Sequence, residues 1–223
     1  MKSNEELQKD VQEAIKWEPL LHAAEIGVTA KDGIVTLTGT VDNYIKKNEA
    51  ETAAKNVVGV SAVIEKIQIK FKGSLQINDE ETAKDALNAL KWDWQVPHDT
   101  IKVKIEDGWV TLTGNVRWNY QKEAAKKAVS SLQHVKGVTN DIAIKEETAD
   151  EIEQKDIEQA LGRTWSIVNA DIKVKVNGHK VTLSGTVESI FQKDEAERIA
   201  WNAPGVWHLE NNLVVEYRYS LVG

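Results

Sequence analysis

Apolar positions in the first third of the chain change from a helical period to strict alternation. Residues 7–15 carry apolar side chains at helical spacing, which predicts an amphipathic helix. Apolar positions then alternate over residues 26–30 and again over residues 35–39, with Asp32 and Gly33 between them. An Asp-Gly pair in that position favours a hairpin with a type I′ turn, because both turn residues need positive φ. The pattern therefore predicts a helix followed by two antiparallel strands.

The two-residue turn also fixes how the two strands pair. Every second residue on both strands then points to one apolar face. The same pattern recurs twice further along the chain, and its third turn, Gly178-His179, suits type II′. The pairs expected on the apolar faces are Ala30/Val35, Val28/Leu37, Ile26/Gly39, Ile105/Val110, Val103/Leu112, Ile101/Gly114, Val176/Val181, Val174/Leu183 and Ile172/Gly185.

An alanine-rich segment and a third alternating segment complete the pattern. Residues 50–57 keep apolar side chains at helical spacing, which predicts a second helix. Asn43 is the expected N-cap of this helix, and Ser189 is the expected N-cap of its counterpart in the third copy. A further strand is expected from Val63. Because the second helix joins the second strand to the third, we expect a right-handed crossover. The predicted fold class is α+β: an α-β-β-α-β unit with a three-stranded mixed sheet and two helices on one face.

The whole pattern occurs three times without an internal gap. A shift of 75 residues carries Trp17 onto Trp92, and a further shift of 71 aligns the third copy. The length differences fall between the copies, in polar stretches at residues 72–80 and 146–154. A gapless unit with variable joints predicts three separate small domains rather than a solenoid. The domains expected are residues 1–72, 76–147 and 150–219.

Six glycines recur at two positions of the unit. Those expected in the hairpin turns are Gly33, Gly108 and Gly178. The other three lie in the second strand, where we expect a helix to cross close to the strand. They are Gly39, Gly114 and Gly185.

Three phrases carry a family resemblance. They are DGWVTLTGNV from Asp107, VKGVTNDIAI from Val135 and NAPGVWHLENNLVV from Asn202. With the order of elements, they resemble the BON domain, named after bacterial osmotically inducible and nodulation-related proteins and also called transport-associated. The resemblance covers nearly the whole chain as three tandem copies. It implies a non-enzymatic protein that binds phospholipid surfaces or envelope proteins and protects cells under osmotic stress.

The resemblance and the N-terminal sequence favour different compartments. The resemblance implies the periplasm, provided that a leader peptide has been removed. The chain as it stands begins with a charged segment of helical pattern, unlike a signal peptide, which favours the cytoplasm. No apolar run approaches the roughly 18 residues that a membrane span needs.

Candidate catalytic chemistry is scarce. The chain has no cysteine, which excludes disulfides and thiolate sites, and its five histidines share no position in the repeat. A metal site or a catalytic triad needs convergent ligands. The acidic cluster at Asp150, Glu151 and Glu153 opens a predicted helix, where negative charge favours the dipole. We therefore expect no catalytic residue, no metal and no cofactor.

Aromatic residues give the clearest candidate site. Eight Trp stand against two Phe. The joints on either side of the hairpin gather at the end opposite its turn, and the second helix points its first N–H groups there, which suits phosphate. Trp and Tyr also favour a membrane–water interface. The residues expected to contact lipid or a partner are Trp92, Trp94, Trp118, Tyr44, Trp17 and Trp165. The alternative is that these rings cap small cores, the interpretation favoured for Trp17 and Trp165.

Three functions follow from these observations. The first is a lipid-binding envelope module. The net charge of −7 disfavours this function for anionic lipid, which attracts basic proteins. The second is a soluble stress-protective scaffold that contacts proteins through its sheets, or a small-ion sensor. An enzyme is disfavoured because no polar constellation converges. Nucleic-acid binding is also disfavoured, since no repeat has a basic excess.

Overall fold

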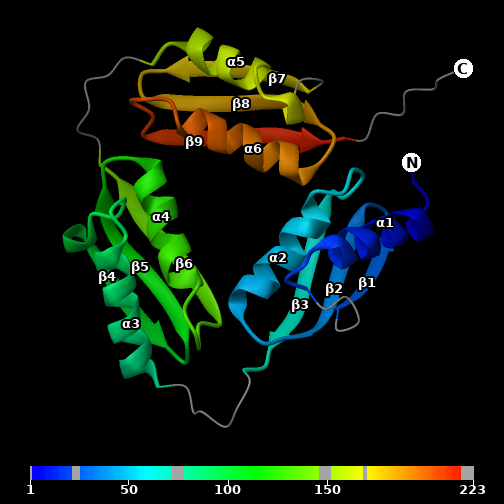
Figure 1. Cartoon of the computed structure of the whole chain (residues 1–223). Coiled ribbons are helices and arrows are strands. Elements are labelled where there is room, and N and C mark those ends of the chain that lie inside the picture. Colours follow the sequence, from blue (N-terminus) through cyan, green and yellow to red (C-terminus); the bar gives the residue numbers. More distant parts are fainter. Residues whose placement is uncertain (1, 22–25, 72–77, 146–151, 168–169, 217–223) are drawn as a thin grey trace, which may run out of the picture. The chain divides into compact units, whose positions relative to one another are not determined.

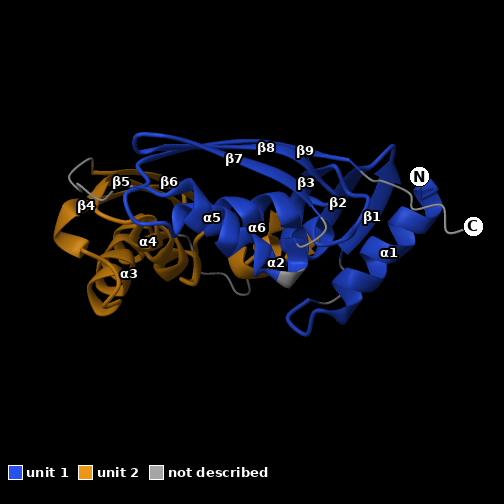
Figure 2. Cartoon of the chain, turned by 90° about the horizontal axis from the view of Figure 1, so that it is seen from above, with its two compact units in different colours: residues 1–39, 49–67, 148–223 blue, residues 40–48, 68–147 orange. Residues whose placement is uncertain are grey.

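The computed structural model describes residues 2–21, 26–71, 78–145, 152–167 and 170–216. Packing groups the chain into two compact units, residues 1–39, 49–67 and 148–223, and residues 40–48 and 68–147 (Figure 2). The expected domain boundaries near residues 72–76 and 147–150 fall largely on stretches outside the described residues. His22, Asp150 and Glu151 also lie outside them.

Each repeat contributes the predicted α-β-β-α-β order. The first repeat contains α1 (Asn4–Trp17), β1 (Ile26–Lys31), β2 (Ile34–Val41), α2 (Tyr44–Lys55) and β3 (Ala62–Ile69). The second contains α3 (Asp79–Trp92), the short 3-10 helix η2 (His98–Thr100), β4 (Ile101–Glu106), β5 (Trp109–Val116), α4 (Asn119–Ser130) and β6 (Gly137–Ile144). The third contains α5 (Gln154–Gly162), η3 (Trp165–Ile167), β7 (Asp171–Asn177), β8 (Lys180–Val187), α6 (Ile190–Trp201) and β9 (His208–Val215).

The strands form three separate three-stranded sheets, with the second strand of each repeat in the centre. β4 and β7 pair antiparallel with β5 and β8, whereas β6 and β9 pair parallel with them. Both helices of a repeat lie on one face of its sheet, as Figures 1 and 2 show. The prediction of three tandem α+β domains with mixed sheets is confirmed.

The hairpin registers are also confirmed in all three repeats. Ile26 pairs with Gly39, Ile101 with Gly114 and Ile172 with Gly185, and the remaining pairs follow as expected. Asp32 and Gly33 have φ of 51° and 79°, as a type I′ turn requires. The third turn has positive φ at Gly178 but not at His179, which agrees with type II′.

Two glycines within the central strands lie close to the backbone of a neighbouring segment. A Cβ on Gly114 would lie 2.1 Å from the carbonyl oxygen of Thr100, and one on Gly185 would lie 1.9 Å from that of Asp171. Thr100 ends η2 and Asp171 begins β7, so the nearest approach to these glycines is made by backbone at the edge strand; the expected close crossing of a helix stays a prediction. Gly114 and Gly185 also have φ of 132° and 120°, which side-chain-bearing residues rarely adopt.

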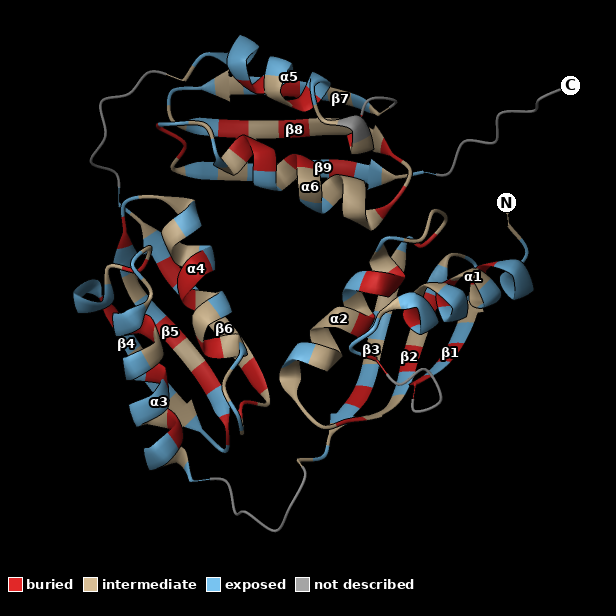
Figure 3. Ribbon diagram, viewed as in Figure 1, coloured by how far each residue is buried: buried red, intermediate tan, exposed pale blue. Residues whose placement is uncertain are grey.

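Each core lies between the sheet and its two helices. Central-strand residues such as Leu37, Leu112 and Leu183 are fully buried and occupy one homologous position. Figure 3 shows buried positions alternating along the central strands and lining the inner faces of the helices. The alternation exposes the other face of each sheet, where the side chains differ among the repeats.

Candidate functional site

Two chain joints meet at one end of the second domain. The first joint, residues 93–100, connects α3 to β4, and the second, Arg117 and Trp118, connects β5 to α4. Ile101 at the start of β4 pairs with Gly114 near the end of β5, so the two joints share the end opposite the Asp107-Gly108 turn. The predicted placement of Trp94 and Trp118 at this end therefore follows from the strand pairing.

The tryptophans that end the first helix of the first two repeats are strongly exposed. Trp17, Trp92 and Trp94 expose 87%, 84% and 88% of their surface. The interpretation that Trp17 caps a core is therefore wrong, because a capping ring would be covered by its own domain. Trp118, which precedes α4, and Tyr44, which begins α2, are half-buried, and Tyr44 packs against the core of the second domain. The backbone of Trp165 lies in η3, and its side chain is outside the described part of the structure.

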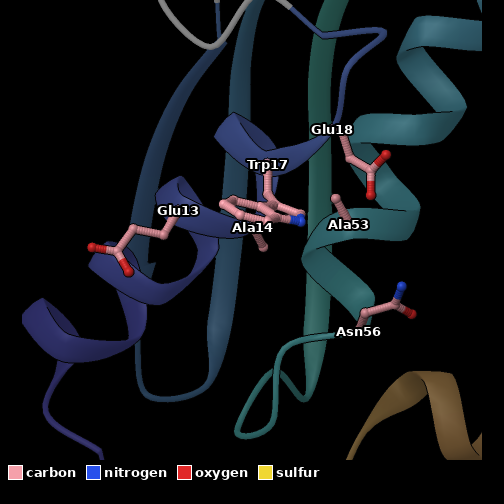
Figure 4. Close-up of a pocket in the computed structure, with 6 residues that line it drawn as sticks. All are labelled: Glu13, Ala14, Trp17, Glu18, Ala53 and Asn56. Carbon is pink, nitrogen blue, oxygen red and sulfur yellow. The ribbon is translucent and has the colours of Figure 1, made fainter.

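Trp17 belongs to a groove between α1 and α2. The groove has a volume of about 370 Å³, and it is lined by Glu13, Ala14, Trp17, Glu18, Ala53 and Asn56 (Figure 4). Ala53 and Asn56 come from the second half of α2 and the turn after it, so Trp17 lies along the helix pair. The sequence predicts this ring near the N-terminus of α2, but the groove places it beside the second half of that helix.

The second helix begins differently in the middle domain. Asn43 accepts a hydrogen bond from the N–H of Lys46 (2.9 Å), and Ser189 accepts one from the N–H of Gln192 (3.2 Å). These contacts confirm both expected N-caps. The homologous residue before α4 is Trp118, whose indole N–H can only donate, so it cannot cap the first turn. In α4 the N–H of Gln121, which corresponds to those of Lys46 and Gln192, donates to the backbone carbonyl oxygen of Trp118 at 3.1 Å, so the first turn has no side-chain cap.

The charge beside this helix start also differs. Arg117 precedes Trp118 and is exposed, whereas acidic residues, Asp42 and Glu188, occupy its position in the first and third domains. Asp42 pairs with Lys46 at 2.9 Å. Sequence reasoning missed Arg117, although comparing aligned repeats for a change of charge sign would have found it. A basic side chain at an uncapped helix start favours an anionic group.

The outer sheet faces carry a second difference near the hairpin turn. In the second domain, the indole N–H of Trp109 donates to Thr139 Oγ1 at 2.9 Å. In the third domain, Lys180 and Glu210 form an ion pair at the homologous positions. In the first domain these positions hold Ile34 and Ile64, which expose 42% and 44% of their surface. They line a shallow depression of about 450 Å³ on the sheet.

His179 and the lowered pKa values of Glu6 and Glu195 serve local structure. His179 stacks on Trp207 with ring centroids 3.5 Å apart, and its Nδ1 lies 2.8 Å from the carbonyl oxygen of Gly205. The N–H of Ser3 lowers the pKa of Glu6 in a capping box, and a hydrogen bond from Arg198 lowers the pKa of Glu195. Within the described ranges, no three acidic or histidine side chains converge as a metal site. In the same ranges, no helix has both the length and the apolarity to cross a bilayer.

Comparison with known sequences gives a consistent result. A family model of the BON domain matches residues 3–70, 78–146 and 149–217. The osmotically-inducible protein Y of Escherichia coli (strain K12) is 31% identical over 129 residues, which cover 56% of this chain and 64% of that protein. The match thus spans less than two thirds of the length of this relative.

Solved structures are less similar. The C-terminal domain of CdsD, a structural protein of the type III secretion system of Chlamydia trachomatis, is 17% identical with a TM-score of 0.26, over 94% of this chain and 97% of that chain. The periplasmic domain of PrgH is 10% identical with a TM-score of 0.24, over 87% of this chain and 96% of that chain.

Proposed function

This chain belongs to the BON domain family, as three tandem copies, and from that premise we propose that it is a non-catalytic envelope protein of the osmotic stress response that contacts phospholipid surfaces. The similarity to the osmotically-inducible protein Y supports the stress role. The periplasm is the compartment that fits this role. Contact with lipid is supported by the exposed aromatic side chains of the middle domain.

The observation that carries the proposal is the exposure of Trp92 and Trp94. Two indoles that expose 84% and 88% of their surface stabilise no core of their own domain. An indole has an apolar body and one N–H donor, and it is therefore most stable where one side is apolar and the other is wet. The headgroup region of a bilayer provides this environment.

The uncapped start of α4 supplies the polar part of the same contact. It lies at the end of the domain where Trp94 also lies, because the two joints share that end. Arg117 and the N–H groups of the first turn of α4 would meet the phosphate of a headgroup. This contact is local, so it operates although the chain carries a net charge of −7.

Vesicle flotation tests the proposal. The full chain is expected to float with vesicles of phosphatidylethanolamine and phosphatidylglycerol, and Trp92→Ala with Trp94→Ala should weaken binding about tenfold or more because two rings leave the interface. Trp118→Ala should also weaken it. Trp109→Phe is the matched control, because Trp109 is half-exposed at the hairpin-turn end of the same domain. An intact affinity after Trp118→Ala, or an equal loss after Trp109→Phe, would contradict the proposed site.

A second candidate function rests on the apolar pair of the first domain. Ile34 and Ile64 occupy outer-face positions that the other two domains fill with a hydrogen-bonded or ion-paired couple. An exposed apolar pair beside a depression favours contact with another protein, as a stress-protective scaffold would make. Ile34→Lys with Ile64→Glu copies the third domain. It should abolish suppression of aggregation of an unfolded test protein while vesicle binding stays unchanged.

A further inference from the structure

The groove between the first and second helices recurs in the third domain. There it has a volume of about 420 Å³ and is lined by Ala160, Arg163, Thr164, Ile199 and Asn202, among other residues. These positions are homologous to Ala14, Trp17, Glu18, Ala53 and Asn56, which line the groove of the first domain. The two domains therefore build the same groove, with a floor of small or apolar residues, and change its rim.

The two rims differ in electrostatic character. In the third domain the acidic residue Asp156 lines the groove together with Arg163. In the first domain this position holds the indole of Trp17, and the next residue is the carboxylate Glu18 instead of Thr164. Figure 4 shows the indole between the carboxylates of Glu13 and Glu18. Glu13 also lies 4.0 Å from Lys9, so Glu18 provides the less compensated negative charge.

The end of α1 strengthens this negative potential. Glu18 is the C-cap of the helix, and its N–H donates to the carbonyl oxygen of Ile15 at 3.2 Å. A helix C-terminus carries a partial negative charge and favours a nearby cation. Placing a carboxylate there adds like charge, and an indole face attracts cations within about 6 Å. The indole, the carboxylate and the helix end thus favour one kind of ligand, a cation with apolar substituents.

Resting on the proposed function, we propose that the α1–α2 groove of the first domain binds the ammonium group of a zwitterionic phospholipid headgroup, between the indole face of Trp17 and the Glu18 carboxylate. An alkylammonium group suits the groove because its methyl or methylene groups contact Ala14 and Ala53 while its charge meets Glu18. The third domain should bind this group less well, because Arg163 takes the place of the indole. The contact is separate from the phosphate contact proposed at α4.

The test uses the full chain and phosphatidylcholine vesicles, with flotation as the measurement. Trp17→Ala should weaken binding about two- to fivefold, the range expected for an exposed cation–π contact. Glu18→Gln should weaken it about twofold, and tetramethylammonium chloride should compete where sodium chloride at equal ionic strength does not. Glu5→Gln removes the same charge from the exposed first turn of α1 and should leave binding unchanged.

A second measurement locates the ligand. Titration with tetramethylammonium should shift the indole N–H resonance of Trp17 in a saturable way, and Glu18→Gln should weaken the response. Arg163→Trp with Thr164→Glu gives the third groove the rim of the first, and it should raise vesicle binding about twofold.

The outcomes separate the two proposals. Binding to phosphatidylcholine that is unaffected by Glu18→Gln and by tetramethylammonium would overturn the ammonium contact and leave the membrane function standing. The absence of binding to vesicles of every composition tested would overturn the membrane function and, with it, the headgroup as occupant of this groove.

Discussion

The second and third domains have the same core and different surfaces at the end opposite the hairpin turn. Leu112 and Leu183 are fully buried at one homologous position, and Gly114 and Gly185 approach the neighbouring backbone in the same way. Before the second helix, however, Arg117-Trp118 in one domain replaces Glu188-Ser189 in the other. The residues that fold the domain have been kept, and those around the uncapped helix have changed in charge and capping. This difference locates the binding role that we propose for the middle domain and not for the third.

The largest effects should come from the shared core. Leu112→Ala and Leu183→Ala should each lower the free energy of unfolding of their own domain by about 2–5 kcal/mol, because both remove a fully buried side chain. Denaturant unfolding measures the loss. Leu183→Ala should leave vesicle binding intact under conditions where the protein stays folded. If Leu183→Ala lowered vesicle binding while the protein stays folded, the binding role would not belong to the middle domain alone.

The close approach at Gly114 should give the next effect. Gly114→Ala places a Cβ 2.1 Å from a backbone oxygen at a φ of 132°, and we expect a loss of about 1–3 kcal/mol in the free energy of unfolding or more. Gly178→Ala is the control, since a Cβ there meets nothing within 4 Å. It should cost less, because only the turn φ of 58° is strained. Equal losses in thermal unfolding would show that the contact with Thr100 is unimportant.

A smaller effect should distinguish the two helix starts. Ser189→Ala removes the hydrogen bond to the N–H of Gln192 and should destabilise the third domain by about 1 kcal/mol. Differential scanning calorimetry with the full chain measures this shift. Unchanged unfolding would mean that the cap is dispensable, and the contrast with the uncapped α4 would then lose its physical basis.

The smallest effect should depend on pH. The hydrogen bond from Arg198 lowers the folded-state pKa of Glu195, so the pair stabilises the fold above the ordinary Glu pKa of about 4.3 and loses this effect as the pH falls through the lowered value. The contribution should stay below about 1 kcal/mol, because Arg198 is largely exposed. Between pH 6 and pH 3, the free energy of unfolding should fall less steeply for Glu195→Gln than for the unaltered chain. An identical slope would contradict the pair.

Much of the fold could be predicted because two independent signals agree. The Asp32-Gly33 turn and the alternation of apolar residues specify the same register, and a one-residue slip would move every apolar side chain to solvent. The helix order and the N-caps at Asn43 and Ser189 were equally readable. The backbone contact of Gly114 was not, since a strand glycine has the same sequence signature whether a helix or a neighbouring strand approaches it.

The candidate site was predictable only in part. The position of Trp118 beside the end of β5 follows from topology, but the exposure of Trp17 does not. A tryptophan that ends an amphipathic helix can fold back over a core or project outward, and the choice depends on the space left by α2. Small residues such as Ala53 leave an open groove beside Trp17, and no larger side chain covers its ring. Local sequence carries no record of that tertiary geometry.

The most direct test of the account exchanges the residues that differ between the two domains. Arg117→Glu with Trp118→Ser gives the middle domain the helix start of the third, and the gained N-cap should offset part of the lost packing of the half-buried indole. Vesicle flotation of this variant should show binding reduced about tenfold or more, with circular dichroism unchanged. Binding equal to that of the unaltered chain would contradict the claim that this end of the middle domain contacts the membrane.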